Sequence, residues 1–159
     1  MNAGKTVKLL AIASVGGHWS ELVRIIPPNL AETELVYVST HPKCESMTEG
    51  CPFHTIRDFS RWDAYLCVPV FFQAICILRK VKPDAVVSTG AAPGLIALFA
   101  ARLLGKKAIW IDSVANVRRL SLSGKIASKF ASQTYTQWES LATSRVKYAG
   151  SIFDEGDQQ

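Results

Sequence analysis

Short apolar segments rich in β-branched residues alternate with longer helix-like stretches along the whole sequence. This order constrains the fold more than any other feature, because strands that alternate with helices form parallel sheets joined by crossover connections. The predicted strands cover residues 7–13, 34–39, 54–56, 85–88, 108–111, 134–137 and 146–148. We therefore predict an α/β fold, a doubly wound parallel sheet with helices on both faces.

Proline and glycine residues mark the ends of the intervening helices. The predicted helices cover residues 19–26, 68–81, 93–105 and 120–131. The third is apolar on nearly all sides, which predicts that it is buried. In the fourth, Leu122, Ile126 and Phe130 form one stripe, and Lys125 and Lys129 form another. We therefore predict that the fourth helix is amphipathic, with a basic outer face.

The length and composition fit one compact domain over residues 1–159. The chain is 48% hydrophobic and 19% charged, which excludes a disordered polyelectrolyte. Its longest apolar run, residues 66–78, holds 13 residues, whereas a membrane-spanning helix needs about 20. We therefore expect that this run does not span a membrane alone. No cleavage site follows the first apolar stretch, so we expect a cytoplasmic protein.

The cysteines and histidines predict neither a metal site nor a cofactor. The four cysteines, at positions 44, 51, 67 and 76, lack the short paired spacings of a zinc site. They also do not resemble a secreted disulfide framework, so we interpret them as free thiols. The three histidines are scattered, and the carboxylates do not cluster.

Positive charge is concentrated in one segment of the chain. Residues 101–130 carry seven lysines and arginines against one carboxylate, although the whole chain has a net charge of only +5. Such a segment attracts the phosphates of a nucleic acid, an anionic membrane or a diphosphate substrate, or it forms a solvated helix face. Stacking aromatic residues are not interleaved with these cations, so a nucleic-acid-binding module is the weakest of these hypotheses.

The first predicted strand ends in Gly16, Gly17 and His18. Two glycines at a strand-to-helix turn let backbone N–H groups approach an anion closely, so this loop is a candidate phosphate cradle. The dinucleotide-binding pattern of three spaced glycines is absent, which disfavours a nicotinamide enzyme. An imidazole at this turn can accept a proton from a bound hydroxyl. Alternatively, His18 caps the following helix or packs on Trp19.

Two further strands also end in residues suited to a binding site. Gly90 lies in a second small-residue turn that opens onto a helix, and Asp112 follows the fifth strand. The carboxyl ends of parallel strands share one edge of the sheet, so both loops face one crevice. Asp112 is either a catalytic or sugar-binding carboxylate or the counter-ion of Arg118 or Arg119.

The apolar run 66–78 is followed by the cations Arg79 and Lys80. One interpretation is a helix in a membrane interface, with Phe71 and Phe72 among acyl chains and the basic end at phosphates. The alternative is a core helix whose basic end complements its dipole. The sequence pattern fits both interpretations.

Several short motifs follow one another in a characteristic order. They are residues 16–21 (Gly-Gly-His-Trp-Ser-Glu), 82–84 (Lys-Pro-Asp), 88–90 (Ser-Thr-Gly), 111–113 (Ile-Asp-Ser), 117–125 (Val-Arg-Arg-Leu-Ser-Leu-Ser-Gly-Lys) and 137–139 (Gln-Trp-Glu). This order resembles the asparagine-linked glycosylation protein 14 family and the related bacterial exopolysaccharide and capsule subunits. The likeness covers almost the entire chain.

The resemblance implies a Rossmann-like domain that forms the N-terminal-type half of a split GT-B glycosyltransferase. It is similar to the N-terminal domain of the peptidoglycan N-acetylglucosaminyltransferase, which acts on a polyprenyl-diphosphate sugar. By resemblance, Gly16, Gly17 and His18 match the loop that faces the lipid diphosphate and the acceptor sugar, and Gly90 matches the second such loop. Asp112 takes a position that is often Glu in the family.

The resemblance also implies an acceptor-binding subunit that docks on a membrane, with the UDP-sugar held by a second chain. We assign Arg118 and Lys125 to the diphosphate, together with the two glycine loops, and either His18 or Asp112 to proton removal. The eukaryotic members have an N-terminal membrane anchor that is not found here, so we expect a peripheral bacterial protein on the inner face of the membrane. The alternative is a non-catalytic scaffold that recruits and activates the second chain.

Overall fold

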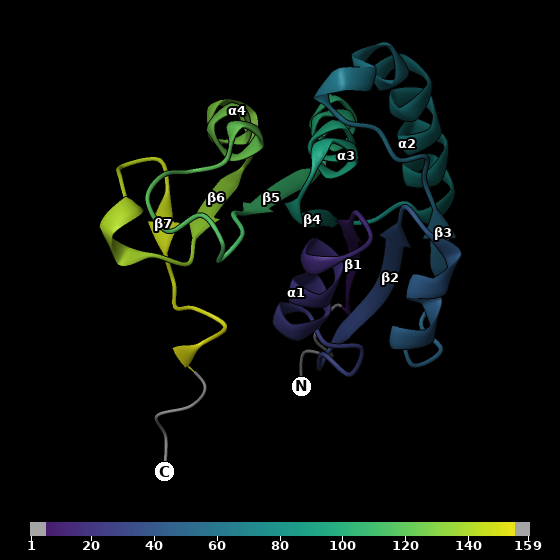
Figure 1. The fold of residues 1–159 in the computed structure, drawn as a ribbon. Helices are drawn as coiled ribbons and strands as arrows, with labels where there is room; N and C mark the ends of the chain where they lie inside the picture. The colour runs from purple at the N-terminus through teal and green to yellow at the C-terminus, as the bar shows by residue number, and fades with distance from the viewer. Residues whose placement is uncertain (1–5, 155–159) are drawn as a thin grey trace.

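The computed structural model describes residues 6–154 and shows a parallel sheet of seven strands (Figure 1). The strands lie in the order β3-β2-β1-β4-β5-β6-β7, and every neighbouring pair is parallel. Their bounds are β1 Val7–Ala13, β2 Thr33–Ser39, β3 Phe53–Thr55, β4 Ala85–Gly90, β5 Lys107–Ile111, β6 Gln133–Thr136 and β7 Lys147–Tyr148. Each strand lies within two residues of its predicted position, so the predicted sheet is confirmed.

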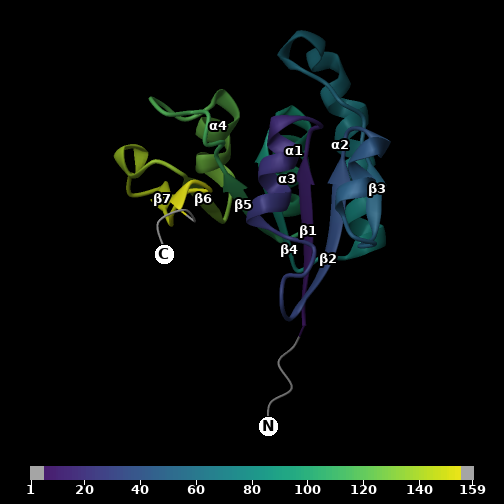
Figure 2. The same ribbon diagram turned by 60° about the horizontal axis from the view of Figure 1, so that its bottom comes forward.

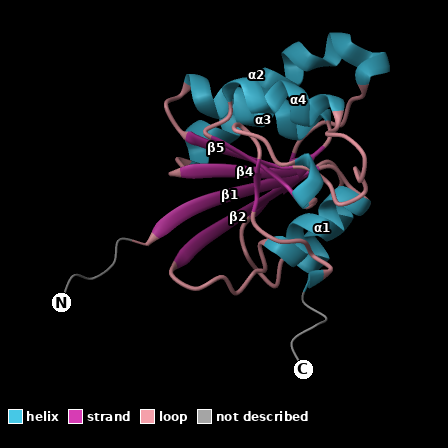
Figure 3. Cartoon of the chain, turned by 90° about the vertical axis from the view of Figure 1, so that its left-hand side faces the viewer, coloured by secondary structure: helices cyan, strands magenta, loops and turns pink. Residues whose placement is uncertain are grey.

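Four α-helices cover the two faces of the sheet unequally. They are α1 Gly17–Ile25, α2 Cys67–Val81, α3 Ala92–Leu103 and α4 Leu122–Phe130, and three short 3-10 helices are η1 Pro42–Met47, η2 Arg61–Leu66 and η3 Glu139–Leu141. Figure 3 shows α2, α3 and α4 on one face and α1 on the other. Right-handed crossovers explain this division, because the chain moves from β1 to β2 in one direction across the sheet but from β3 to β4, β5 and β6 in the other.

Each face of the sheet has its own apolar core. On the face of α2, α3 and α4, Leu10, Val86 and Trp110 pack beneath the buried side chains of the three helices. On the face of α1, Trp19 and Leu22 pack with apolar side chains of β1, β2 and β4. Both faces of the central strands are therefore buried, which explains why their sequences are nearly continuous apolar runs.

Two predictions about helix surfaces hold only in part. Helix α3 buries only part of its circumference, because Phe99 and Leu103 are exposed. Helix α4 buries Gly124 and Ala127, while Leu122 and Ile126 of its apolar stripe are exposed. Lys125 and Lys129 are exposed, so the predicted basic outer face is confirmed. Of the predicted apolar stripe, only Phe130 packs on the core.

The apolar run 66–78 belongs to a longer helical segment. Helices η2 and α2 together cover Arg61–Val81, a segment of 21 residues that is long and apolar enough to cross a membrane by length and composition. The expectation of a run too short to span therefore does not hold. Helix α2 nevertheless buries Val70, Ala74 and Leu78 in the core, so it is also part of the globular fold. Figure 2 shows the segment before α2 projecting beyond the sheet.

All four cysteines are free thiols, as predicted. Cys44 is buried, Cys51 and Cys67 are half-buried, and Cys76 is exposed on α2.

Candidate functional site

The candidate site lies where the connections of the sheet diverge. Strands β1 and β4 are neighbours, but β1 leads through α1 to one side of the sheet and β4 leads through α3 to the other. In open α/β sheets, such a divergence leaves a crevice at the carboxyl ends of the strands. His18 follows β1 at this crevice, and Gly90 ends β4.

The loops after β1 and β4 hold one another in place. The Thr89 hydroxyl donates a hydrogen bond to the backbone oxygen of His18 at 2.7 Å. The His18 ring packs against Gly90 so closely that a Cβ atom at position 90 would overlap it. Gly90 has a φ of 152° and Ala91 a φ of 68°, and both values disfavour L side chains. The position of His18 is therefore fixed by a strained turn.

A small cavity of about 150 Å³ lies beside His18. Its walls come from the loops after β1, β4 and β5 and from the start of α4; they are His18, Thr89, Gly90, Ala91, Trp110, Asp112, Ser113, Asn116, Ser121, Leu122 and Ser123. The structure thus brings together three residues that the sequence predicted as site residues: His18, Gly90 and Asp112.

Three helices begin at this cavity, and two of them lack a side-chain cap. His18 lies in the first turn of α1, Ala91 precedes α3, and neither helix has a side-chain hydrogen bond to its first turn. Uncapped amide groups at helix N-termini favour an anion. His18 Nδ1 has no hydrogen-bond partner among the described residues, and it is buried against Gly90 rather than open to the cavity. The cavity therefore suits an anionic ligand.

Asp112 is engaged by uncharged donors on both of its carboxylate oxygens. The side chain is buried, at 1% exposure. Its Oδ1 accepts from Trp110 Nε1 at 3.0 Å and from Ser121 Oγ at 2.6 Å. Its Oδ2 accepts from Ser121 N at 3.0 Å and from Asn116 Nδ2 at 3.1 Å. These contacts fix the loop that follows β5 against the start of α4.

The counter-ion alternative for Asp112 is wrong. Within residues 6–154, one ion pair forms, between Lys8 and Glu34 at 2.7 Å, and Asp112 pairs with neither Arg118 nor Arg119. Both arginines are exposed to solvent.

The residues Ser121 and Gly124 explain why α4 starts beside Asp112. The Ser121 hydroxyl accepts a hydrogen bond from Gly124 N at 2.8 Å and so caps the helix. A Cβ atom at position 124 would overlap Asp112 Oδ1. The Leu-Ser-Leu-Ser-Gly-Lys motif therefore supplies a helix cap and a close approach to the buried carboxylate.

We expect Asp112→Asn to lower the free energy of unfolding by about 3 kcal/mol, as measured by urea denaturation. Whichever way the new amide is turned, its NH₂ group faces two donors that the carboxylate accepted. The control is Asn116→Ala, which removes one of these donors and costs about 1 kcal/mol. A loss below about 0.5 kcal/mol in Asp112→Asn would contradict this structural role.

The other predicted binding residues lie outside the small cavity. Gly16, Gly17, Arg118 and Lys125 are exposed, and none of them lines it. Asn116 and Ser121 also line the small cavity but were not predicted as site residues. A serine near the start of the predicted helix 120–131 was the available signal for Ser121.

A larger cavity of about 650 Å³, which the sequence did not predict, lies on the other face of the sheet. Its walls come from the end of α1, from β5 and β6, and from the C-terminal segment; they are Arg24, Ile25, Ile111, Tyr135, Thr136, Gln137, Ala149, Gly150, Ser151, Ile152 and Asp154. On this face, Ile109 and Ile111 of β5 pack against the core beneath α1.

A protein-family model matches the part of the chain that forms most of this site. The model of the Alg14-like oligosaccharide biosynthesis proteins matches residues 62–152, which is more than half of the chain. The chain belongs to this Alg14-like family. The resemblance found in the sequence motifs is thereby confirmed.

Two groups of relatives align with this Alg14-like chain. The UDP-N-acetylglucosamine transferase subunit ALG14 of Yarrowia lipolytica is 27% identical over 172 residues, covering 90% of this chain and 80% of the relative. The UDP-N-acetylglucosamine--N-acetylmuramyl-(pentapeptide) pyrophosphoryl-undecaprenol N-acetylglucosamine transferase of Streptococcus uberis is 32% identical over 120 residues. That alignment covers 68% of this chain but 33% of the streptococcal protein, so the chain spans a third of its length.

Solved structures confirm the fold of this Alg14-like chain. MurG of Acinetobacter baumannii superimposes with a TM-score of 0.75 at 18% identity, over 96% of this chain and 49% of MurG. The UDP-N-acetylglucosamine 2-epimerase of Rickettsia bellii gives a TM-score of 0.71 at 17% identity, over 94% of this chain and 46% of the epimerase. The chain therefore has the predicted Rossmann-like architecture of one GT-B half.

Proposed function

We propose that this chain is the acceptor-binding subunit of a two-chain inverting glycosyltransferase. The enzyme transfers a sugar from a UDP-sugar to a polyprenyl-diphosphate-linked acceptor in exopolysaccharide or oligosaccharide biosynthesis. Family membership supports the transferase class. The names of the relatives support UDP-N-acetylglucosamine as the donor and a pyrophosphoryl-polyprenol as the acceptor.

The observation that carries this proposal is the small cavity beside His18. Two uncapped helix N-termini and the capped start of α4 meet there, and His18 lines the same space. This set of groups fits a diphosphate held by backbone amides with an imidazole next to it. The volume of about 150 Å³ suits the diphosphate, and the acceptor sugar extends toward the second chain.

In this proposal His18 removes the proton from the acceptor hydroxyl as the nucleotide diphosphate leaves. Asp112 is less suited to that step, because its oxygens already accept four hydrogen bonds. Its role is to hold the loop after β5 in place. Donors that stabilise the leaving group belong to the second chain.

The split enzyme is supported by the Yarrowia lipolytica relative, which is named a transferase subunit and is covered to 80% by this chain. We expect the purified chain alone to transfer no sugar, and the complex with the chain that binds the UDP-sugar to transfer it. The measurement is the release of UDP in the presence of polyprenyl-diphosphate-sugar acceptor. Turnover by the homogeneous single chain would contradict the split enzyme.

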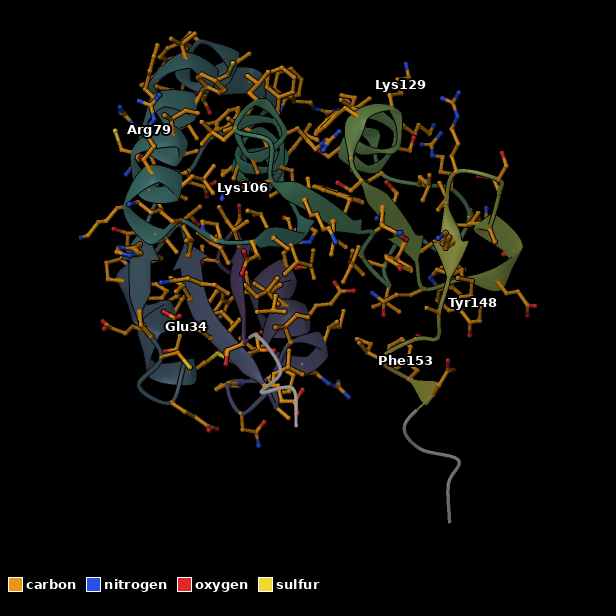
Figure 4. The ribbon with its side chains drawn as sticks, turned by 180° about the vertical axis from the view of Figure 1, so that it is seen from behind. Glu34, Arg79, Lys106, Lys129, Tyr148 and Phe153 are labelled. Carbon is orange, nitrogen blue, oxygen red and sulfur yellow. The ribbon has the colours of Figure 1, made fainter. Side chains whose placement is uncertain are left out.

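The face formed by η2, α2, α3 and α4 supports docking on the cytoplasmic face of a membrane. Its exposed apolar side chains are Trp62, Tyr65, Val68, Phe72, Phe99, Leu103, Leu122 and Ile126. Exposed cations on the same helices include Arg79, Lys80, Arg102, Lys125 and Lys129. Figure 4 shows Arg79 on α2 and Lys129 pointing outward from α4. Apolar groups flanked by cations match the interface of an anionic bilayer.

Of the two phenylalanines predicted to contact the membrane, Phe72 has the exposed ring. Phe72 is 61% exposed, whereas Phe71 is half-buried and packs on Phe99, with ring centroids 6.3 Å apart. Phe71 therefore packs beneath the exposed face and contacts Phe99.

We expect Phe72→Ser to weaken binding to anionic phospholipid vesicles by about tenfold, because burial of a phenylalanine side chain contributes about 1.5–3 kcal/mol. The matched control is Phe153→Ser. Phe153 is also well exposed, at 65%, but lies in the C-terminal segment away from the helical face (Figure 4). Vesicle sedimentation measures both variants. Equal loss of binding in the two variants would contradict docking through the helical face.

A further inference from the structure

Glu21 is a buried carboxylate that the proposed reaction does not use. It is 5% exposed and lies three residues after His18, on the same side of α1. Its Oε1 accepts hydrogen bonds from Val114 N at 2.8 Å and from the Gln137 side-chain amide. Both donors are uncharged, and no ion pair within residues 6–154 includes Glu21. A buried carboxylate is tolerated only when it is well hydrogen-bonded, so these two contacts are important for the stability of its position.

Gln137 completes the contact from the other side. It is buried directly after β6. Its Nε2 donates to Glu21 and to the backbone oxygen of Asp112 at 3.2 Å, while its Oε1 accepts from Ile152 N at 3.1 Å. The orientation of the amide follows from these partners, because a carboxylate and a carbonyl only accept and a backbone N–H only donates. Every polar atom of the Gln137 side chain is therefore engaged.

The pair clamps the first residues of the loop after β5. Val114 is held on both sides: its N–H donates to Glu21, and its oxygen accepts from Trp138 Nε1 at 2.7 Å. Its neighbour Ser113 lines the small cavity, and so does Asn116. The helix that carries His18 is thus tied through Glu21 to the opposite wall of the cavity.

We propose that Glu21 and Gln137 are positioning residues that set the separation between His18 and the 113–121 loop, and so the fit of the acceptor diphosphate. This inference rests on the proposed function, because it assigns the diphosphate to the small cavity. Neither residue lines the small cavity, and Gln137 lines the larger one. The pair acts by holding two walls of the small cavity at a fixed distance.

The test compares disruptive and conservative variants of the pair in the two-chain complex. Glu21→Leu removes the acceptor, and Gln137→Glu places a second carboxylate against Glu21. Both raise the acceptor KM about 10-fold, because a displaced loop weakens the contacts to the diphosphate, and kcat changes less. Glu21→Gln keeps an oxygen for both donors and stays close to wild type.

Indole N–H resonances in an NMR spectrum report the loop position independently of activity. The Trp138 indole N–H donates a hydrogen bond to the backbone oxygen of Val114. Trp62 is 80% exposed and serves as the internal control. Glu21→Leu shifts the Trp138 resonance and leaves that of Trp62 unchanged. A folded Glu21→Leu protein with a wild-type acceptor KM and an unshifted Trp138 resonance overturns the inference.

If the proposed function is wrong, the wild-type complex transfers no sugar at all, and no acceptor KM can be measured. The Trp138 resonance then decides alone whether the pair holds the loop: a shift in Glu21→Leu supports the clamp, and no shift overturns it.

Discussion

Replacing His18 by alanine is expected to lower kcat of the two-chain complex by about 10²- to 10⁴-fold, which is the usual contribution of a general base. The His18 imidazole lines the small cavity. Its Nδ1 makes no hydrogen bond with the described residues. Its backbone remains anchored by Thr89 in the variant. The measurement is the initial rate of UDP release at saturating acceptor and donor.

A matched histidine elsewhere in the sheet separates this effect from a general loss of a histidine. His54 lies in β3, away from the switch point between β1 and β4, and we expect His54→Ala to keep kcat within about twofold. Thermal unfolding of both variants checks that each is folded. Unchanged turnover in His18→Ala would exclude its role as the base and favour the non-catalytic scaffold.

The parallel sheet was predictable because both of its faces are buried. Strand β1 was predicted with its observed bounds, Val7–Ala13, since a strand covered on two sides is apolar at nearly every position. The meeting of His18, Gly90 and Asp112 was also predictable. In a parallel sheet all strands end at one edge, so residues that follow different strands become neighbours.

The surface of α4 was not predictable from its hydrophobic stripe. The pattern identifies the apolar side of a helix, but it does not say whether that side meets the core, a membrane or a partner. In this chain the buried residues of α4 are Gly124 and Ala127, and Phe130 packs on the core. Asp112 and Ser121 leave no room for a Cβ atom at position 124. Leu122 and Ile126 are left exposed for the proposed membrane face.

The roles of Asp112 and Glu21 depend on partners that are distant in the sequence. Glu21 and Gln137 are 116 residues apart, and no local pattern indicates that they meet. The same holds for the cavity beside the C-terminal segment, which forms between α1 and the chain after β6. Hydrophobic periodicity predicts where strands end and therefore where the loops lie. Which side chains of those loops contact one another is seen only in the structure.

Gly90→Ala is the second substitution with a large expected effect. A Cβ atom at position 90 would overlap the His18 ring, and the φ of 152° adds strain for any L side chain. We expect kcat to fall by about 10²-fold as His18 is displaced, and the free energy of unfolding to fall by about 1–3 kcal/mol. Initial rates and urea denaturation measure the two effects.

A double-mutant cycle shows whether the damage acts through His18. In the His18→Ala background the overlap is absent, so Gly90→Ala should cost about 1 kcal/mol less stability and should not lower kcat further. The matched control is Gly105→Ala after α3, where φ is 71° and no atom lies within 4 Å of the added Cβ. Its stability cost should be the same with or without His18. If Gly90→Ala is equally harmful in both backgrounds, its effect comes from backbone strain alone, and the packing of His18 on Gly90 does not position the base.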